Sequence, residues 1–371
     1  MGKLAFLLLM AGWSATALAG TRVNVEQVEQ LLAASHDLPD GKLAEKLYGL
    51  ELVERASSAR LSYWQSLFAG AHTREALLAL ADASAFLDLP AQDVLPKAEP
   101  DSVATKQIFV RAIAYANTTI KKLPNFSAKR NTLHFDNIPA AQRVLNQSLR
   151  ETGSGMRRTA GPGGGPAPAP GLSRSGDETS VVVTYRDGQE VADAQPGNGK
   201  KVDLRGFGLT TYGEFGPILS VVIADVIHGK LYWGHWEMGE SGPVAVFQYS
   251  VSQETSHFTV IGGGNMTQSP SYHGEIAVDP ANGTILRITM ASDWKPPFQP
   301  SESDILVEYA PVQIGSGTYI CPVRGVALSK LPYTPGGDMD AGHYLVPTQT
   351  YLNDVTFTDY HVFRGEVRIV P

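Results

Sequence analysis

The hydrophobic positions of the chain repeat with two different periods, and the change falls near residue 177. Before it, apolar side chains recur every three to four residues, which is the spacing of one helix face. Thr73 is the predicted N-cap of one such helix, and Pro90 stops it. The short polar joints favour a small antiparallel helical bundle. The predicted helices cover 24–35, 42–56, 57–68, 73–87 and 102–123.

After residue 177 apolar and polar positions alternate, which is typical of half-buried strands. The strands are predicted over 180–185, 231–238, 244–251, 256–261, 276–278, 285–290, 304–309, 317–323, 348–357 and 361–370. Turn residues at 186–188 and 279–283 join neighbouring strands, so the spacing predicts a largely antiparallel, curved sheet resembling a half-barrel. Residues 131–136 are interpreted as an isolated strand that joins this sheet. The apolar stretch 217–227 begins with Pro217, which favours a helix laid across the sheet.

Composition separates these two regions further. Residues 153–176 contain 12 Gly or Pro among 24, which predicts a flexible linker. Residues 20–152 carry 15 basic and 15 acidic side chains, whereas residues 177–371 carry 11 basic and 22 acidic. An acidic surface disfavours phosphate contacts, so we expect no nucleic-acid partner. The predicted fold class is α+β, with a helical domain at 20–152, the linker, and an antiparallel β domain with one apolar helix at 177–371.

Residues 1–19 have the pattern of a secretory signal peptide. Lys3 precedes an apolar run over 4–13, and Ala17-Leu18-Ala19 forms a small-residue cleavage site. The run is too short to span a bilayer core of about 30 Å, and no later stretch predicts a transmembrane segment. A buried N-terminal helix is the alternative interpretation. We expect a periplasmic or secreted protein, cleaved near Ala19. With Cys321 as its lone cysteine, the chain cannot hold an intrachain disulfide or a cysteine zinc cluster.

Several segments carry a resemblance to known proteins. The chain resembles a group of uncharacterised exported bacterial proteins in 80–90, 123–130, 212–220, 244–251, 272–288 and 357–364. Strand order and the 217–227 helix also make residues 177–371 similar to the half-barrel of the bacterial lipoprotein carriers, the LolA/LolB and RseB-like group. That resemblance implies a curved sheet covered by helices over an apolar cavity that takes lipid or acyl chains. The helical N-terminal region departs from the carriers' pattern.

Aromatic side chains suggest where a ligand would bind, because 21 of the chain's 32 Phe, Trp and Tyr fall after residue 177. Alternation over 231–238 predicts Tyr232, Trp236 and Met238 on one strand face. Such a surface offers a large contact area to a lipid, a peptide or a sugar ring, although it is also what a sheet's core requires. The candidate ligand-binding residues are Tyr212, Phe215, Tyr232, Trp236, Met238, Phe247 and Tyr249.

A second set of candidates is titratable. His235 and Glu237 alternate onto one predicted strand face with Leu231 and Trp233, and Glu214 lies earlier in the chain. These groups could serve acid–base chemistry in an exported hydrolase, but the pair lacks the third ligand of a zinc site. No motif predicts a metal centre or a cofactor. The leading hypothesis is a non-enzymatic exported protein that binds an apolar or amphiphilic ligand and meets an envelope protein through its helical domain. A structural envelope protein is a further alternative.

Overall fold

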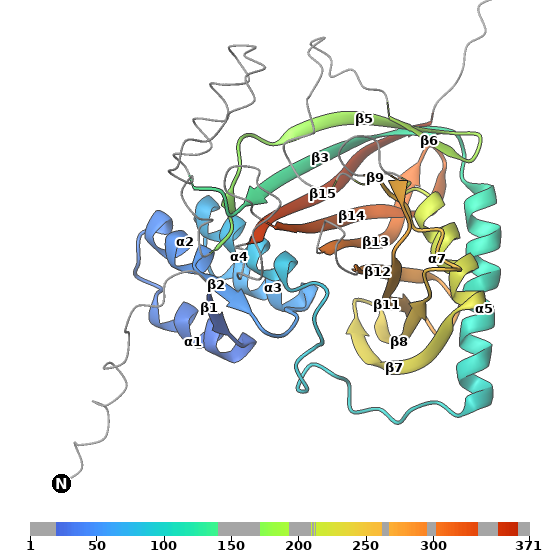
Figure 1. The fold of residues 1–371 in the computed structure, drawn as a ribbon, viewed down its shortest axis with the longest axis horizontal. Coiled ribbons are helices and arrows are strands. Elements are labelled where there is room, and N and C mark those ends of the chain that lie inside the picture. The colour runs from blue at the N-terminus through green and yellow to red at the C-terminus, as the bar shows by residue number, and fades with distance from the viewer. Residues whose placement is uncertain are drawn as a thin grey trace, which may run out of the picture.

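The computed structural model describes residues 20–139, 171–192, 209, 211, 213–261, 267–294, 302–332 and 348–362. The described residues leave out the predicted signal peptide, residues 153–170 of the predicted linker, Tyr212, and residues 363–370 of the strand predicted over 361–370. Within them the protein is α+β, with an open antiparallel sheet of 11 strands and helices on both of its faces (Figure 1).

The first part of the chain folds into a compact unit, here called the N-terminal module, spanning residues 21–83. Its core is formed around fully buried Val28, Trp64 and Leu77. Asn24 begins its first helix as a capping box with Gln27. The module's elements are β1 (Thr21–Val23), α1 (Val25–Ala34), α2 (Asp40–Tyr48), β2 (Leu50–Leu52), α3 (Ser58–Ser66) and α4 (Ala71–Ala83).

Two boundaries in this module correct the sequence prediction. The helix expected over 42–56 ends at Tyr48, and Leu50–Leu52 instead pairs in parallel with Thr21–Val23. Backbone pairing with a distant segment overrides the helical spacing of the apolar residues. Thr73 is not an N-cap, because α4 begins at Ala71 after Gly70. The backbone N–H of Thr73 donates instead to the Asp40 carboxylate at 2.8 Å, which ties α4 to α2.

The large sheet has the strand order β6-β5-β3-β15-β14-β13-β12-β11-β8-β7, and β4 pairs with β3. All of its paired neighbours run antiparallel. The first five strands by number are β3 (Phe126–Asp136), β4 (Ser173–Arg174), β5 (Thr179–Arg186), β6 (Gln189–Ala192) and β7 (Lys230–Gly239). The others are β8 (Gly242–Val251), β11 (Ser271–Val278), β12 (Ile285–Asp293), β13 (Glu302–Ile314), β14 (Gly317–Pro332) and β15 (Thr348–Val362).

The predicted turns lie where the sequence placed them. Asp187 and Gly188 both have positive φ and join β5 to β6, as a tight two-residue hairpin requires. Gly283 has a φ of 82° and ends the turn between β11 and β12. The segment expected as a strand over 256–261 contributes only β9 (Val260–Ile261), which pairs with β10 (Thr267–Gln268) outside the large sheet.

Strand β3 lies inside the large sheet, between β5 and β15, and the preceding helix α5 (Ser102–Lys122) packs on that sheet too. Both lie within residues 20–152, where the sequence indicated a helical domain. Ser173–Arg174, at the end of the predicted linker, forms β4. The expected apolar helix is present as α7 (Pro217–His228), with Pro217 in its first turn.

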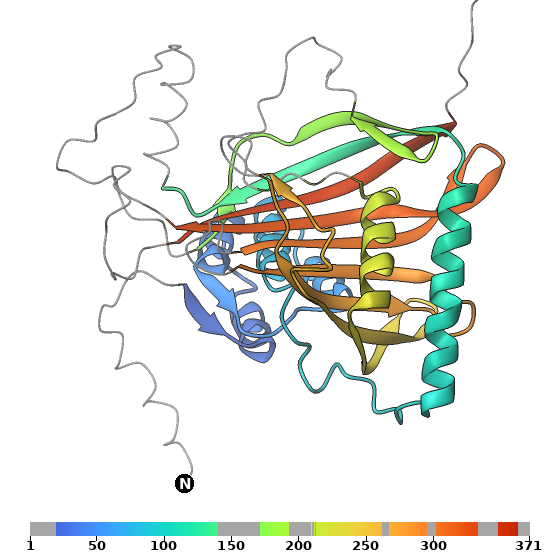
Figure 2. The same ribbon diagram turned by 45° about the vertical axis from the view of Figure 1, so that its right-hand side comes forward.

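Alternating side chains of each central strand face two different partners. On β13, Ile305 and Val307 point toward α5 and α7, and this side is called the helix-side face. Leu306, between them, packs with Ala79 and Ala85 from the end of the N-terminal module, and this side is called the module-side face. Figure 2 shows α5 and α7 crossing in front of the strands, with the module behind them.

Candidate functional site

The helix-side face is covered by a continuous apolar layer. Strands β7, β8 and β11–β13 contribute its floor, and α5 and α7 close it from above. Helix α7 supplies buried Leu219, Val222 and Val226, and α5 supplies Ile108 and Ala112. This arrangement buries one apolar face of the sheet against two helices, which is how a sheet is normally covered.

Four of the candidate ligand-binding residues lie in the interior. Phe247 is fully buried in the apolar layer beside Tyr249 and Trp236. Phe215 is buried in a separate aromatic cluster with Phe126 and Phe357. The structure therefore joins three of the candidates in one layer and places Phe215 next to a different part of the sheet.

The other two described candidates lie on edge strand β7 and are exposed. Tyr232 keeps 53% of its surface accessible, and Met238 keeps 62%. A β-bulge explains why the predicted shared face is wrong. Trp233 pairs with Phe247 but His235 pairs with Val246, so Gly234 is an extra residue in β7.

After the bulge the two strand faces exchange. Trp236 lies on the helix-side face with Trp233, and their ring centroids are 5.0 Å apart. His235 and Glu237 lie on the opposite face with Tyr232, not with Trp233 as alternation predicts. The alternation of apolar and polar residues along a strand cannot reveal one inserted residue, although a glycine within a strand is a common sign of a bulge.

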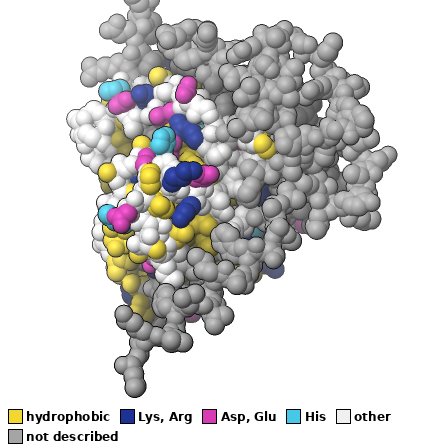
Figure 3. All heavy atoms as spheres, turned by 90° about the vertical axis from the view of Figure 1, so that its left-hand side faces the viewer, with side chains coloured by type: hydrophobic (Ala, Val, Ile, Leu, Met, Phe, Trp, Pro, Cys, Tyr) yellow, Lys and Arg dark blue, Asp and Glu magenta, His cyan; other side chains and the backbone are white. Residues whose placement is uncertain are grey.

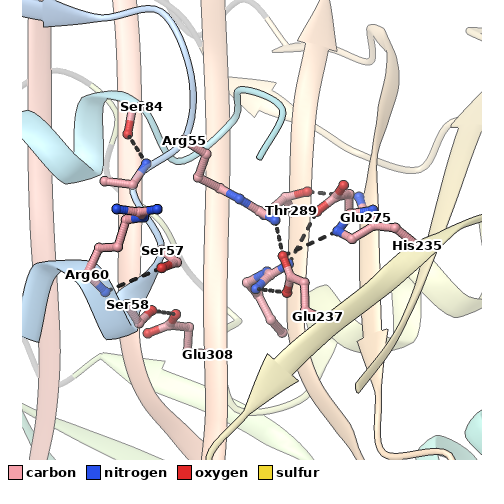
Figure 4. A network of polar contacts seen from close by, with 12 residues as sticks. Arg55, Ser57, Ser58, Arg60, Ser84, His235, Glu237, Glu275, Thr289 and Glu308 are labelled. Atoms are coloured by element: carbon pink, nitrogen blue, oxygen red, sulfur yellow. Dashed lines mark hydrogen bonds and ion pairs between the residues drawn. The ribbon is translucent and has the colours of Figure 1, made fainter. Parts of the chain in front are cut away.

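His235 and Glu237 are part of a buried ionic network that joins the N-terminal module to the module-side face (Figure 4). Arg55, which follows β2 and is 5% exposed, bonds the Glu237 carboxylate and reaches Glu275 Oε2 at 2.9 Å. Arg287 Nη1 lies 2.9 Å from Glu237 Oε2. The His235 Nε2 atom is 3.4 Å from Glu237 Oε1.

The charges around Glu237 decide what this carboxylate can do. Burial opposes its ionisation, but Arg287, the hydrogen bond from His235, and Arg55 outweigh burial and lower the pKa of Glu237 to about 2. A carboxylate with so low a pKa is a weak proton acceptor at neutral pH. The arrangement of His235 and Glu237 therefore favours a structural ion network over acid–base chemistry.

Glu214 belongs to a different cluster, on the helix-side face. It is 1% exposed and lies 3.3 Å from the Arg130 guanidinium, through its Oε1 atom. Arg130 also donates to the Thr211 carbonyl at 2.9 Å, and the Thr211 hydroxyl donates to Glu214. No contact between Glu214 and the His235–Glu237 pair is recorded among the described residues, so the three acid–base candidates do not form one site there.

Glu190, at the start of β6, is the residue near Glu214 that the sequence did not single out. It accepts the Gly213 N–H at 2.9 Å. Burial and then the charge of Glu214 raise the pKa of Glu190 to about 8. Arg55 and Arg130 were missed as well. Each is one basic residue with no motif around it, and its partners lie 81 to 220 residues away.

Two surface hollows lie on the N-terminal module instead of the sheet. The larger has a volume of about 600 Å³ and lies along α3 and the start of α4. The smaller, of about 230 Å³, shares Gln65 and Arg74 with it. Figure 3 shows that basic, acidic and apolar side chains are mixed over the side of the N-terminal module that faces the viewer there. Its mixed charge agrees with the equal number of basic and acidic residues in 20–152.

The described part of the chain contains no helix long and apolar enough to cross a membrane. Within the same residues, no group of three or more His, Cys, Asp or Glu is placed to hold a metal ion. The lone thiol, Cys321, is buried, and burial raises its pKa to about 12. Its sulfur is therefore protonated at neutral pH and poorly nucleophilic.

The fold and its layers define an α+β protein with an open antiparallel sheet, apolar on the helix-side face and ionic on part of the module-side face. No family model matches the chain, and no curated protein matches it. Among solved structures, it is similar to a Vibrio parahaemolyticus domain described as an outer membrane lipoprotein-sorting protein. The two are 9% identical with a TM-score of 0.32, and the match covers 72% of this chain and 95% of that one. The function proposed below rests on the side chains of this chain alone.

Proposed function

We propose that this protein is exported and non-enzymatic, and that it binds an apolar or amphiphilic ligand, such as a lipid or acyl chain, against the helix-side face. The observation that carries the proposal is the apolar layer under α5 and α7. Side chains fill that layer here, so a ligand enters by displacing a covering helix from the strands.

The two covering helices are suited to such a displacement. The irregular segment 84–101 connects α5 to the N-terminal module, so α5 can move without unfolding the module. Exposed apolar side chains lie on the two covering helices, with Val110 on α5 and Ile227 on α7. An exposed apolar surface next to a buried apolar layer gives an acyl chain a first contact.

The proposed location outside the cytoplasm rests on the sequence of residues 1–19. The helical region supplies the surface for a protein partner of the cell envelope. Its exposed Leu67 lines the larger hollow with Phe68, where a partner would find an apolar contact.

The layer contains tryptophans that can report on its occupancy. Trp233 and Trp236 lie in it, whereas Trp64 lies in the core of the N-terminal module. A fatty acid with a dibrominated chain quenches only nearby indoles, so we expect it to reduce the fluorescence of the whole protein more than the unbrominated chain does.

Matched variants locate the bound chain. The W64F variant should keep the specific quenching, and W233F and W236F should each reduce it. Equal quenching by brominated and unbrominated chains, or a loss confined to W64F, would contradict binding in the apolar layer. Replacing tryptophan by phenylalanine keeps an apolar ring at each position, so all three variants should remain folded.

A further inference from the structure

A second kind of site borders the apolar layer, and it places two carboxyl groups near a single arginine. It consists of Arg130 on β3, Glu190 on β6, Thr211 and Glu214 before α7, and Tyr309 on β13, and it is called the carboxylate cluster. Glu214 lies next to the Arg130 guanidinium, and Glu190 lies near enough to Glu214 for that charge to raise its pKa. Arg130 points both terminal nitrogens at Thr211, at 2.9 and 3.0 Å, and one of them lies 3.3 Å from Glu214.

Each carboxylate of the cluster has one oxygen left over. Glu214 uses Oε1 for Arg130 and Thr211, and its buried Oε2 has no hydrogen-bond partner among the described residues. Glu190 uses Oε2 for the Gly213 N–H, and within the same residues its buried Oε1 has none. Native proteins satisfy most buried polar atoms, so two unpaired acceptors in one cluster call for an explanation, such as a missing donor.

Tyr309 is an independent sign that a group is missing. This side chain is 7% exposed, and its hydroxyl has no hydrogen-bond partner in the described part of the chain. It is close enough to the cluster that the charge of Glu214, after burial, contributes to raising its pKa. Tyr309 is also a member of the apolar layer, with Val307 on the same strand. The cluster is therefore adjacent to the proposed ligand surface.

A buried aromatic ring adjoins Glu214 in the sequence, and aromatic rings favour positive charge. Phe215 follows Glu214 directly and lies 5.2 Å from the ring of Phe126 and 5.0 Å from that of Phe357, between centroids. The faces of aromatic rings attract ammonium groups, and they do so more strongly where water is excluded. An anionic head group would instead meet two carboxylates with one arginine already engaged.

We propose that the ligand of the helix-side face is a cationic amphiphile, whose ammonium group binds Glu190 and Glu214 while its chain lies in the apolar layer. This inference rests on the proposed function, because the chain must enter the layer for the ammonium group to reach the cluster. An ammonium group donates to the free carboxyl oxygens and replaces the proton that the raised pKa of Glu190 keeps on this group at neutral pH. The Tyr309 hydroxyl is a further polar neighbour for it.

The test compares ligands that share a dodecyl chain and differ in head group. Dodecyltrimethylammonium, dodecylammonium, dodecanoate and a neutral dodecyl glycoside are titrated below their micelle concentrations into the whole protein, and the binding of each is measured separately by isothermal titration calorimetry. We expect the dodecylammonium ion to bind at least about tenfold more tightly than the neutral glycoside, and dodecanoate to bind most weakly. The trimethylammonium ligand, which cannot donate hydrogen bonds, should fall between dodecylammonium and the glycoside.

Two conservative variants assign the preference to the cluster. E190Q and E214Q each replace an ionisable carboxyl group by an amide of similar volume that cannot become an anion opposite the ammonium group, so each should reduce the tenfold ratio toward one. E240Q, at an exposed carboxylate in the turn between β7 and β8, should leave it unchanged. The ratio of the affinity for dodecylammonium to that for the glycoside is measured within each variant. A variant that binds all four ligands more weakly therefore leaves this ratio unchanged.

The outcomes separate this inference from the proposed function. If all four ligands bind equally, the apolar layer binds chains but the cluster does not select an ammonium group, and the inference fails alone. If none binds, the proposed function fails. A preference that survives in both E190Q and E214Q would place ammonium recognition elsewhere and overturn the inference as well.

Discussion

At the scale of single residues, the buried carboxyl of Asp304 is expected to make the stability of the protein depend on pH. Asp304 is 5% exposed and accepts the Ser292 N–H at 3.0 Å. Burial raises its pKa to about 7, against an ordinary value of 3.8. The folded protein then binds more protons than the unfolded chain between these values. This contribution to stability is therefore present at low pH and is lost as the pH rises from about 4 to 7.

The D304N variant should remove this dependence. Asparagine keeps an oxygen for the Ser292 N–H and hydroxyl, which both donate to Asp304 Oδ1. Between pH 5 and 7 the unfolding free energy of the parent should fall by up to about 1.4 kcal/mol per pH unit relative to that of D304N. Urea unfolding at several pH values measures the difference. D37N, at an exposed aspartate, should run parallel to the parent, and a constant gap for D304N would disprove the raised pKa.

The residue scale is also where sequence reasoning was weakest. His235 and Glu237 were found as candidates because they lie two apart, but Arg55, which decides their role, is 182 residues from Glu237. Glu214 was found, whereas Glu190 and Tyr309 were not. Burial and the loss of hydrogen-bond partners make these two groups notable, and neither property is visible until the strands are paired.

At the scale of elements, Gly283 is expected to matter more than its turn alone requires. It has a φ of 82°, and a Cβ atom at this position would lie 2.6 Å from the backbone carbon of Arg111 in α5. Gly188 has nearly the same φ, 83°, but no atom within 4 Å of its Cβ position. Comparing the two glycines therefore separates two contributions to the loss of stability on substitution by alanine: the unfavourable backbone conformation, and the steric clash with α5.

We expect G188A to reduce the unfolding free energy by about 1 kcal/mol, as alanine in the left-handed region does. G283A should cost at least about 1 kcal/mol more, because α5 must shift away from the turn. Chemical unfolding measures both, and amide hydrogen exchange in α5 should speed up in G283A alone. Equal losses of unfolding free energy in the two variants would contradict this expectation. They would mean that α5 moves away from the turn without a measurable loss of stability.

The same elements show why most of the fold could be predicted. Alternation located most strands of the sheet, and the turn residues at 187–188 and 279–283 lie in real turns. Pro217 begins α7 as expected. Errors arose where a distant partner or an inserted residue decides the structure, as in β2, which pairs with β1, and at the Gly234 bulge.

At the scale of the whole molecule, the chain joins regions that composition separated. Arg324 on β14 is the clearest connection between the N-terminal module and the sheet. It bonds Asp82 of α4 and reaches Asp354 Oδ2 at 2.9 Å and Glu308 Oε2 at 3.5 Å. Asp82 and Asp354 are each 2% exposed. Burial, together with the charge of Asp354, raises the pKa of Asp82 even though Arg324 opposes that shift.

Removing this arginine should loosen the module from the sheet. R324M keeps much of the aliphatic volume but leaves three carboxylates facing one another, so we expect a loss of about 3 to 5 kcal/mol of unfolding free energy. Limited proteolysis should then cleave the connecting segment 84–101 faster than in the parent.

D82N is the matched variant on the other side of the contact. Its amide keeps an oxygen for Arg324 and places a donor toward Asp354, so its stability should stay within about 1 kcal/mol of the parent. Similar large losses in both variants would mean that the ionised Asp82–Arg324 pair itself holds the module in place. Unchanged proteolysis in R324M would mean that the apolar contacts around Phe135 and Leu352 suffice to hold the module on the sheet.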